Sequence, residues 1–126
     1  MTSLLFIEDD DSIRLALSLA LEDEGYDVRE AANGLEAIAM LEEPGIDAVL
    51  LDLRMAPVDG WEVLEHLRAN DRLPGLPVVM LSAHADPAMA ARALELGCSS
   101  YMSKPFAAAD LLAAIAAGEA GRVATS

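Results

Sequence analysis

Short apolar runs alternate along this chain with longer segments in which apolar residues recur at helical spacing. The apolar runs predict five β-strands, at residues 4–7, 27–31, 48–51, 78–81 and 99–102. The segments that follow them predict five α-helices, at residues 12–24, 35–42, 61–69, 87–96 and 107–117. Strict alternation of strands and helices is typical of a parallel sheet covered by helices on both faces. The pattern therefore predicts an α/β fold.

Turn and capping residues support several of these boundaries. Asp11 or Ser12 can cap the first helix, and Gly25 can end it. Asp10 and Asp11 are interpreted as capping acids and not as residues of a site. Asp86 followed by Pro87 is a strong helix start, because an acid suits the N-cap and proline suits the first helical position. The stripe predicted to face inward on the first helix consists of Ile13, Leu17, Ala20 and Leu21.

Right-handed crossovers between five parallel strands favour the flavodoxin-like, doubly wound sheet with strand order 2-1-3-4-5. We expect one domain at residues 1–118, followed by a flexible C-terminal tail at residues 119–126, with the last helix ending near Ala117.

The composition indicates a globular domain in the cytoplasm. The 126 residues are 54% apolar, and 22 acidic against 8 basic residues give a net charge of −14. Such a surface repels nucleic-acid backbones and anionic membranes, so we expect neither direct nucleic-acid binding nor membrane insertion. Cys98 is the only cysteine, so no internal disulfide can form, and the apolar run before Glu8 is too short for a signal peptide or a membrane span.

Side chains that can bind a metal or a phosphoryl group follow four of the five predicted strands. They are Glu8 and Asp9, Asp52, Ser82, and Lys104. The carboxyl ends of parallel strands meet at one edge of a sheet, where α/β proteins bind ligands, so we expect these five side chains in one crevice. The edge strand at residues 27–31 ends without such a residue, which agrees with the predicted strand order.

The three carboxylates predict a cation site. Two carboxylates ~5 Å apart repel by on the order of 3 kcal/mol at an effective dielectric of about 20, so three together need positive charge. Mg²⁺ suits oxygen ligands and a coordination sphere completed by water, with Ca²⁺ as the alternative. We expect Asp9 and Asp52 as direct ligands, Glu8 as a ligand through water, and the main-chain carbonyl of Arg54 as a further ligand.

A carboxylate beside Mg²⁺ and an ammonium group can attack phosphorus and form an aspartyl phosphate. Asp52 is the candidate nucleophile and phosphoacceptor. Lys104 can hold one phosphoryl oxygen, and Ser82 can donate a hydrogen bond to another. Phosphorylation is therefore expected to draw the segments after the fourth and fifth strands inward.

From Leu4 to about Ala117 the chain resembles the receiver domain of two-component response regulators, of the chemotaxis type that consists of a single domain. The segments that carry the resemblance are FIEDD at residues 6–10, LLDLRM at 50–55, VDG at 58–60, MLSA at 80–83 and YMSKPF at 101–106. The resemblance implies a phosphorylation-dependent signalling switch in place of a turnover enzyme, with slow self-dephosphorylation.

The resemblance also implies roles for individual residues. Asp52 would accept a phosphoryl group from a histidine kinase or a phosphotransfer protein, and Ser82, Ala83 and Lys104 would bind that group. Ser82 and Tyr101 would reposition on activation. The surface of helix four, strand five and helix five would then control a downstream protein, with the chain a monomer or a dimer linked to phosphorylation.

Residues near the site add two further expectations and one departure. The resemblance implies a cis peptide bond between Lys104 and Pro105. It also assigns Arg54 and His84 to positions that tune the lifetime of the phosphoryl group, and we expect Arg54 to restrict the attacking water. The acceptor loop of the family has proline four residues after the aspartate, whereas this chain has Pro57 one position later.

Two other functions stay open at this point. The chain could be an interaction module that works without phosphorylation, although all five site residues are present. It could also be an aspartyl phosphatase of the haloacid-dehalogenase type that depends on Mg²⁺. That class carries a second aspartate two residues after the nucleophile, where this chain has Arg54, and also a cap domain that a short chain cannot hold.

Overall fold

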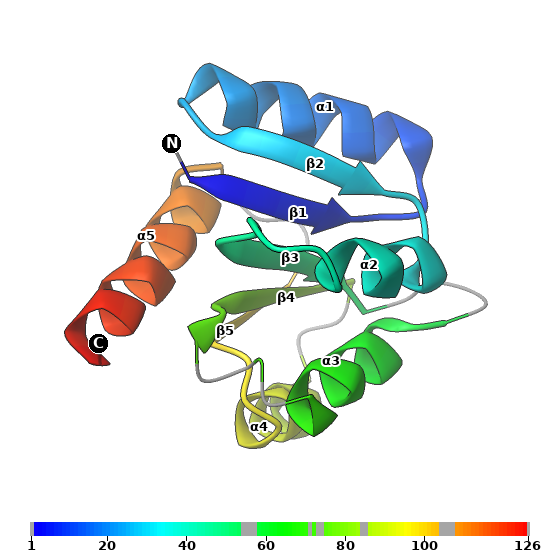
Figure 1. Cartoon of the computed structure of the whole chain (residues 1–126), viewed down its shortest axis with the longest axis vertical. Coiled ribbons are helices and arrows are strands. Elements are labelled where there is room, and N and C mark those ends of the chain that lie inside the picture. The colour runs from blue at the N-terminus through cyan, green and yellow to red at the C-terminus, as the bar shows by residue number, and fades with distance from the viewer. Residues whose placement is uncertain are drawn as a thin grey trace.

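The computed structural model describes residues 2–53, 58–70, 72, 75–83, 86–103 and 108–125. Strands and helices alternate in the order β1 Ser3–Ile7, α1 Asp11–Asp23, β2 Asp27–Ala31, α2 Gly34–Leu41, β3 Ala48–Asp52, α3 Gly60–Ala69, β4 Val78–Ser82, α4 Pro87–Glu95, β5 Ser100–Ser103 and α5 Ala108–Thr125. All strand pairs are parallel, and the sheet has the order β2-β1-β3-β4-β5 (Figure 1). The predicted fold and strand order are confirmed.

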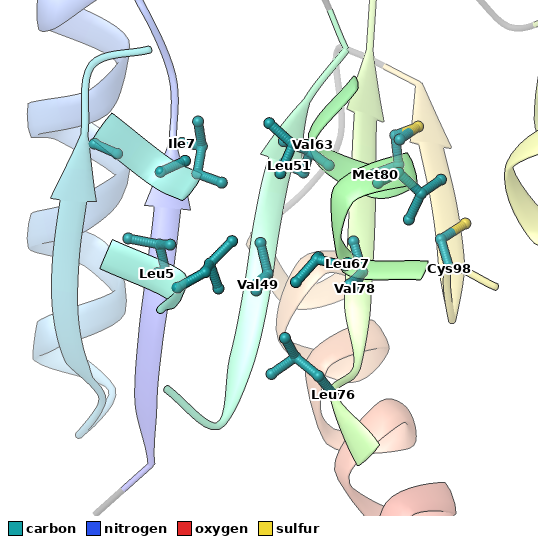
Figure 2. Close-up of a cluster of buried hydrophobic side chains, with 14 of the residues drawn as sticks. Leu5, Ile7, Val49, Leu51, Val63, Leu67, Leu76, Val78, Met80 and Cys98 are labelled. Carbon is teal, nitrogen blue, oxygen red and sulfur yellow. The ribbon is translucent and has the colours of Figure 1, made fainter. Parts of the chain in front are cut away.

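Helices cover both faces of the sheet, and two apolar clusters hold them there. Alternate residues of β1 serve the two faces: Leu5 packs in one cluster and Leu4 in the other. The first cluster joins the sheet to α2, α3 and α4, and Figure 2 shows Val63 and Leu67 of α3 packed over the central strands. The second joins it to α1 and α5. Burial on both faces explains why the central strands read as continuous apolar runs.

The helix starts follow the capping rules, with one correction. Asp86 caps α4 and Pro87 opens it, as predicted. The cap of α1 is Asp10, whose side chain accepts a hydrogen bond from the main-chain N–H of Ile13 at 3.0 Å. The interpretation of Asp10 as a capping acid is confirmed, and the prediction of Asp11 or Ser12 is wrong. Consecutive acidic residues can all cap a helix, and the main-chain hydrogen bond from the N–H of Arg14 to the carbonyl oxygen of Asp10 at 2.9 Å makes Asp10 the cap here.

The inward face of α1 also differs from the prediction. Leu17 and Leu21 pack on the sheet as expected, but Ile13 is 44% exposed and Ala20 is exposed as well. Ser18 is buried in their place. Nearly every position of this helix between the acidic ends is apolar or small, so spacing alone does not define its rotation. The packing of Leu21 against the sheet defines the rotation of the helix.

The last helix is longer than predicted, because α5 continues to Thr125 instead of ending near Ala117. Each glycine in a helix costs about 1 kcal/mol relative to alanine, and the alanines around Gly118 and Gly121 favour helix enough to offset this. That residues 119–126 form a flexible tail stays a prediction. Within the residues that the structure describes, no helix is both long enough and apolar enough to cross a membrane.

Candidate functional site

Three carboxylates meet at the carboxyl edge of the sheet. Oxygen atoms of Glu8, Asp9 and Asp52 all lie within 4.8 Å of one another. Glu8 and Asp52 are buried, at 2% and 5% exposure, whereas Asp9 is open to solvent. The predicted proximity of these side chains is confirmed.

The sheet brings these residues together through its register. β1 and β3 are neighbours, and the pairing of Ile7 with Leu51 sets Glu8 and Asp52 at the same level. The main-chain N–H of Glu8 donates to the carbonyl oxygen of Ala31 at 3.1 Å, which continues the pairing with β2 one residue past β1. The carboxylate of Glu8 therefore projects from an ordered backbone.

Gly60 allows α3 to begin directly against the end of β3. Its N–H donates to the carbonyl oxygen of Leu53 at 3.0 Å, which turns the chain beside Asp52. A Cβ atom at this position would lie 2.6 Å from the carbonyl oxygen of Asp52 and 2.8 Å from the Cα of Leu53. Any side chain here would therefore displace the backbone that carries Asp52.

The cluster raises the proton affinity of its exposed member. Partial removal of water from the carboxyl of Asp9, together with the hydrogen bond and charge of Glu8, raises the pKa of Asp9 above its ordinary value of 3.8. Crowded carboxylates of this kind are stabilised by a bound cation. Three hard oxygen donors, one of them reached by solvent, match what Mg²⁺ requires, because Mg²⁺ keeps several water ligands. The donor set therefore fits a divalent cation.

The hydroxyl and the aromatic residue predicted for the site lie on adjacent strands. Ser82 ends β4, is 1% exposed and pairs with Ser103 of β5. Its neighbour Ala83 is exposed. Tyr101 pairs with Met80, is half-buried, and borders a cavity of about 240 Å³. The other residues that line this cavity are Asp86, Pro87, Ala90 and Ser103.

Several predicted residues lie outside the described part of the chain. They are Arg54, Pro57, His84, Lys104 and Pro105. The carbonyl ligand, the lifetime-tuning positions, the cation beside the acceptor and the cis peptide bond therefore stay predictions. So do the roles assigned to Asp52, Ser82 and Tyr101, whose positions alone are described.

Arg14 lies beside the cluster and is not among the predicted site residues. The guanidinium of Arg14 on α1 donates to the main-chain carbonyl oxygen of Glu8 at 2.7 Å. It also pairs with Asp11 at 2.5 Å and with Glu30 of β2 at 3.3 Å. Asp11 and Arg14 are three residues apart on one helix, a spacing that predicts an ion pair between them. The contact with Glu8 depends on helix rotation, which the sequence did not define.

Known proteins agree with this architecture. A family model described as the response regulator receiver domain matches residues 4–116. The transcriptional regulatory protein AfsQ1 of Streptomyces coelicolor is 40% identical over 105 residues, which cover 83% of this chain and 45% of that protein. The sensory transduction protein RegX3 of Mycolicibacterium smegmatis is 37% identical over 117 residues, which cover 93% of this chain and 50% of that protein.

A solved structure extends the likeness over the whole chain. The response regulator receiver domain protein from Clostridium thermocellum superposes with a TM-score of 0.92 at 26% identity, and covers 100% of both chains. This chain spans about half the length of the curated relatives it matches. Family model, relatives and fold agree, and the chain belongs to the response regulator receiver domain family.

Proposed function

We propose that this chain is a phosphorylation switch in which Asp52 accepts a phosphoryl group from a histidine kinase or a phosphotransfer protein. The observation that carries the proposal is the cluster of Glu8, Asp9 and Asp52 at the carboxyl edge of a receiver-type sheet. Asp52 is the member of the cluster that ends β3, where it pairs with Leu81 of β4, and the N–H of the next residue, Leu53, donates to the carbonyl oxygen of Leu81 at 2.9 Å. A buried carboxylate held in this way is a positioned nucleophile.

In the proposed transfer an oxygen of Asp52 attacks the phosphorus atom of a phosphohistidine. The new O–P bond forms as the P–N bond breaks, and the electron pair of that bond stays on the imidazole nitrogen. Asp9, Asp52, the main-chain carbonyl of Arg54 and, through water, Glu8 would hold Mg²⁺, which when bound would neutralise charge on the transferring group. Water then hydrolyses the aspartyl phosphate slowly, at a rate tuned by Arg54 and His84.

The residues assigned to the bound phosphoryl group are Ser82, Ala83 and Lys104. Ser82 is the last residue of β4, which lies beside β3, and its hydroxyl can donate to a phosphoryl oxygen. Lys104 is the next residue in the sequence after β5, and its ammonium group can bind a second phosphoryl oxygen. Both groups are needed because the phosphoryl group adds about −1.5 to −2 charges next to carboxylates. Their attraction pulls on the ends of two neighbouring strands at once.

We propose that this pull changes the surface formed by α4, β5 and α5. Tyr101 supports this location, since it lies on β5 and borders the cavity beside α4. The outward signal is then a protein contact, in a chain that is monomeric or dimerises on phosphorylation in the cytoplasm. The relatives named above as a transcriptional regulatory protein and a sensory transduction protein are about twice as long, so the partner for this chain is either a separate protein or a further segment.

Phosphorylation by a small-molecule donor tests the proposal. The purified chain is incubated with acetyl phosphate and Mg²⁺, and its intact mass is compared with that of Asp52→Asn. We expect the parent to gain the mass of one phosphoryl group and the variant to gain none. No gain in the parent favours an interaction module that works without phosphorylation, and rapid multiple turnover of phosphoesters favours a phosphatase.

A further inference from the structure

Arg14 connects three elements at the back of the carboxylate cluster. Its side chain is 16% exposed and reaches from α1 to the segment that joins β1 to the helix. There it donates to the carbonyl oxygen of Glu8, while its remaining N–H groups pair with Asp11 of α1 and Glu30 of β2. The planar guanidinium thus has partners on the loop, the helix and the edge strand.

The contact with Glu8 differs from the two ion pairs in what it fixes. Asp11 is 86% exposed and Glu30 is 40% exposed, and pairs of this kind contribute little to stability. The carbonyl of Glu8, in contrast, belongs to the peptide unit that joins Glu8 to Asp9. A charge-assisted hydrogen bond to that carbonyl sets the orientation of the peptide, and with it the direction in which both side chains leave the backbone.

The charge of Arg14 and its geometry act on a bound cation in opposite directions. A positive charge beside the cluster repels Mg²⁺, so removing the charge alone strengthens metal binding. Loss of the hydrogen bond to the Glu8 carbonyl frees the peptide and weakens metal binding. The sign of the change on substitution therefore separates a positioning role from a purely electrostatic one.

We propose that Arg14 is a positioning residue for the metal site, acting on Glu8 and Asp9 through the peptide between them. The inference rests on the proposed Mg²⁺ site. In other metal proteins, residues that hydrogen-bond to the ligands without binding the metal hold those ligands in orientation. Their loss lowers metal affinity by about 10-fold or more. If Arg14 only joined α1 to β2, its substitution would lower the stability of the protein and leave metal affinity unchanged.

Two substitutions of Arg14 and one control separate these roles. Arg14→Lys keeps the charge and loses the fork geometry, and Arg14→Gln loses both. Arg29→Gln is the matched control, because Arg29 is an exposed arginine next to Glu30 on the same edge strand and points to the opposite face of the sheet. Mg²⁺ affinity is measured by calorimetry on metal-free protein, and NMR of the Asp9 and Asp10 amides reports the geometry of the segment before metal is added.

We expect both Arg14 variants to bind Mg²⁺ about 10-fold more weakly than the parent, with shifted Asp9 and Asp10 amides, and Arg29→Gln to bind like the parent. Unchanged affinity in both variants overturns the inference, and so does tighter binding by Arg14→Gln with parental binding by Arg14→Lys. If Arg14→Gln does not fold, Arg14→Lys decides alone. A parent that binds no Mg²⁺ refutes the metal site and this inference together, whereas a parent that binds with equal variants refutes only the role of Arg14.

Discussion

Removing the charge of Asp9 is expected to stabilise the metal-free protein, although it removes a proposed metal ligand. The carboxylate oxygens of the cluster lie within 4.8 Å of one another. At that separation two unit charges repel by about 1 kcal/mol in water and by about 3.5 kcal/mol at an effective dielectric near 20. Asp9 is exposed, so the value near that of water applies, and its pairs with Glu8 and Asp52 together cost about 2 kcal/mol.

The pH dependence of this gain follows from the pKa of Asp9. Partial desolvation and the neighbouring Glu8 raise that pKa in the folded protein above 3.8. Because folding raises the pKa of this carboxyl, the folded protein binds its proton more tightly than the unfolded chain does. Below about pH 4 the carboxyl is protonated in both states, so it does not lower the free energy of unfolding. The cost develops as the pH rises toward the folded pKa and is complete above it. The advantage of Asp9→Asn is therefore absent in acid and full at neutral pH.

Urea unfolding followed by circular dichroism measures both effects. Parent, Asp9→Asn and Glu65→Gln are compared in EDTA and in saturating Mg²⁺. Glu65 is an exposed acid of α3, so its substitution removes the same charge outside the cluster. We expect Asp9→Asn alone to have a higher midpoint in EDTA, and Mg²⁺ to raise the midpoint of the parent much more than that of Asp9→Asn. A midpoint for Asp9→Asn equal to or below that of the parent in EDTA, with a native spectrum, contradicts the reasoning.

Three further predictions follow from single contacts. Gly60→Ala should lower the free energy of unfolding, measured by urea titration, by about 2 kcal/mol or more, because the added Cβ would lie 2.6 Å from the carbonyl oxygen of Asp52. Gly75→Ala is the control and should change it little, because no atom lies within 4 Å of the added Cβ. Ser18→Ala should raise the free energy of unfolding by about 1 kcal/mol, since among the described residues the buried Ser18 hydroxyl has no hydrogen-bond partner; a loss of stability measured by urea unfolding would count against this. Burial raises the pKa of the Cys98 thiol to about 11, so iodoacetamide should label it slowly near pH 8 in the folded protein and quickly in urea; equal rates would mean that the thiol is accessible.

The fold could be predicted from the sequence because its signals are local and agree with one another. Continuous apolar runs such as Val78 to Leu81 mark strands buried on both faces, and Asp86 with Pro87 marks a helix start to the residue. The errors occur where several neighbouring residues satisfy the same rule. Asp10 caps α1, although Asp11 and Ser12 are equally suitable by composition.

The site was predictable to the extent that it depends on strand order. Once β1 and β3 are neighbours, Glu8, Asp9 and Asp52 must meet, and they do. The contact of Arg14 with Glu8 was not predictable, because it requires the rotation of α1 about its own axis. That rotation is fixed by tertiary packing, and the leucines at positions 15, 17, 19 and 21 are spread around the helix, so their spacing alone does not define it.

Locating the phosphoryl group within the chain tests whether Asp52 is the phosphoacceptor. After treatment with acetyl phosphate and Mg²⁺, borohydride reduction converts an aspartyl phosphate to homoserine, which tandem mass spectrometry then places in the sequence. We expect homoserine at position 52 and nowhere else, and much less of it when EDTA replaces Mg²⁺. Homoserine at another acidic residue, or an unmodified Asp52 in folded protein that contains Mg²⁺, would contradict this expectation.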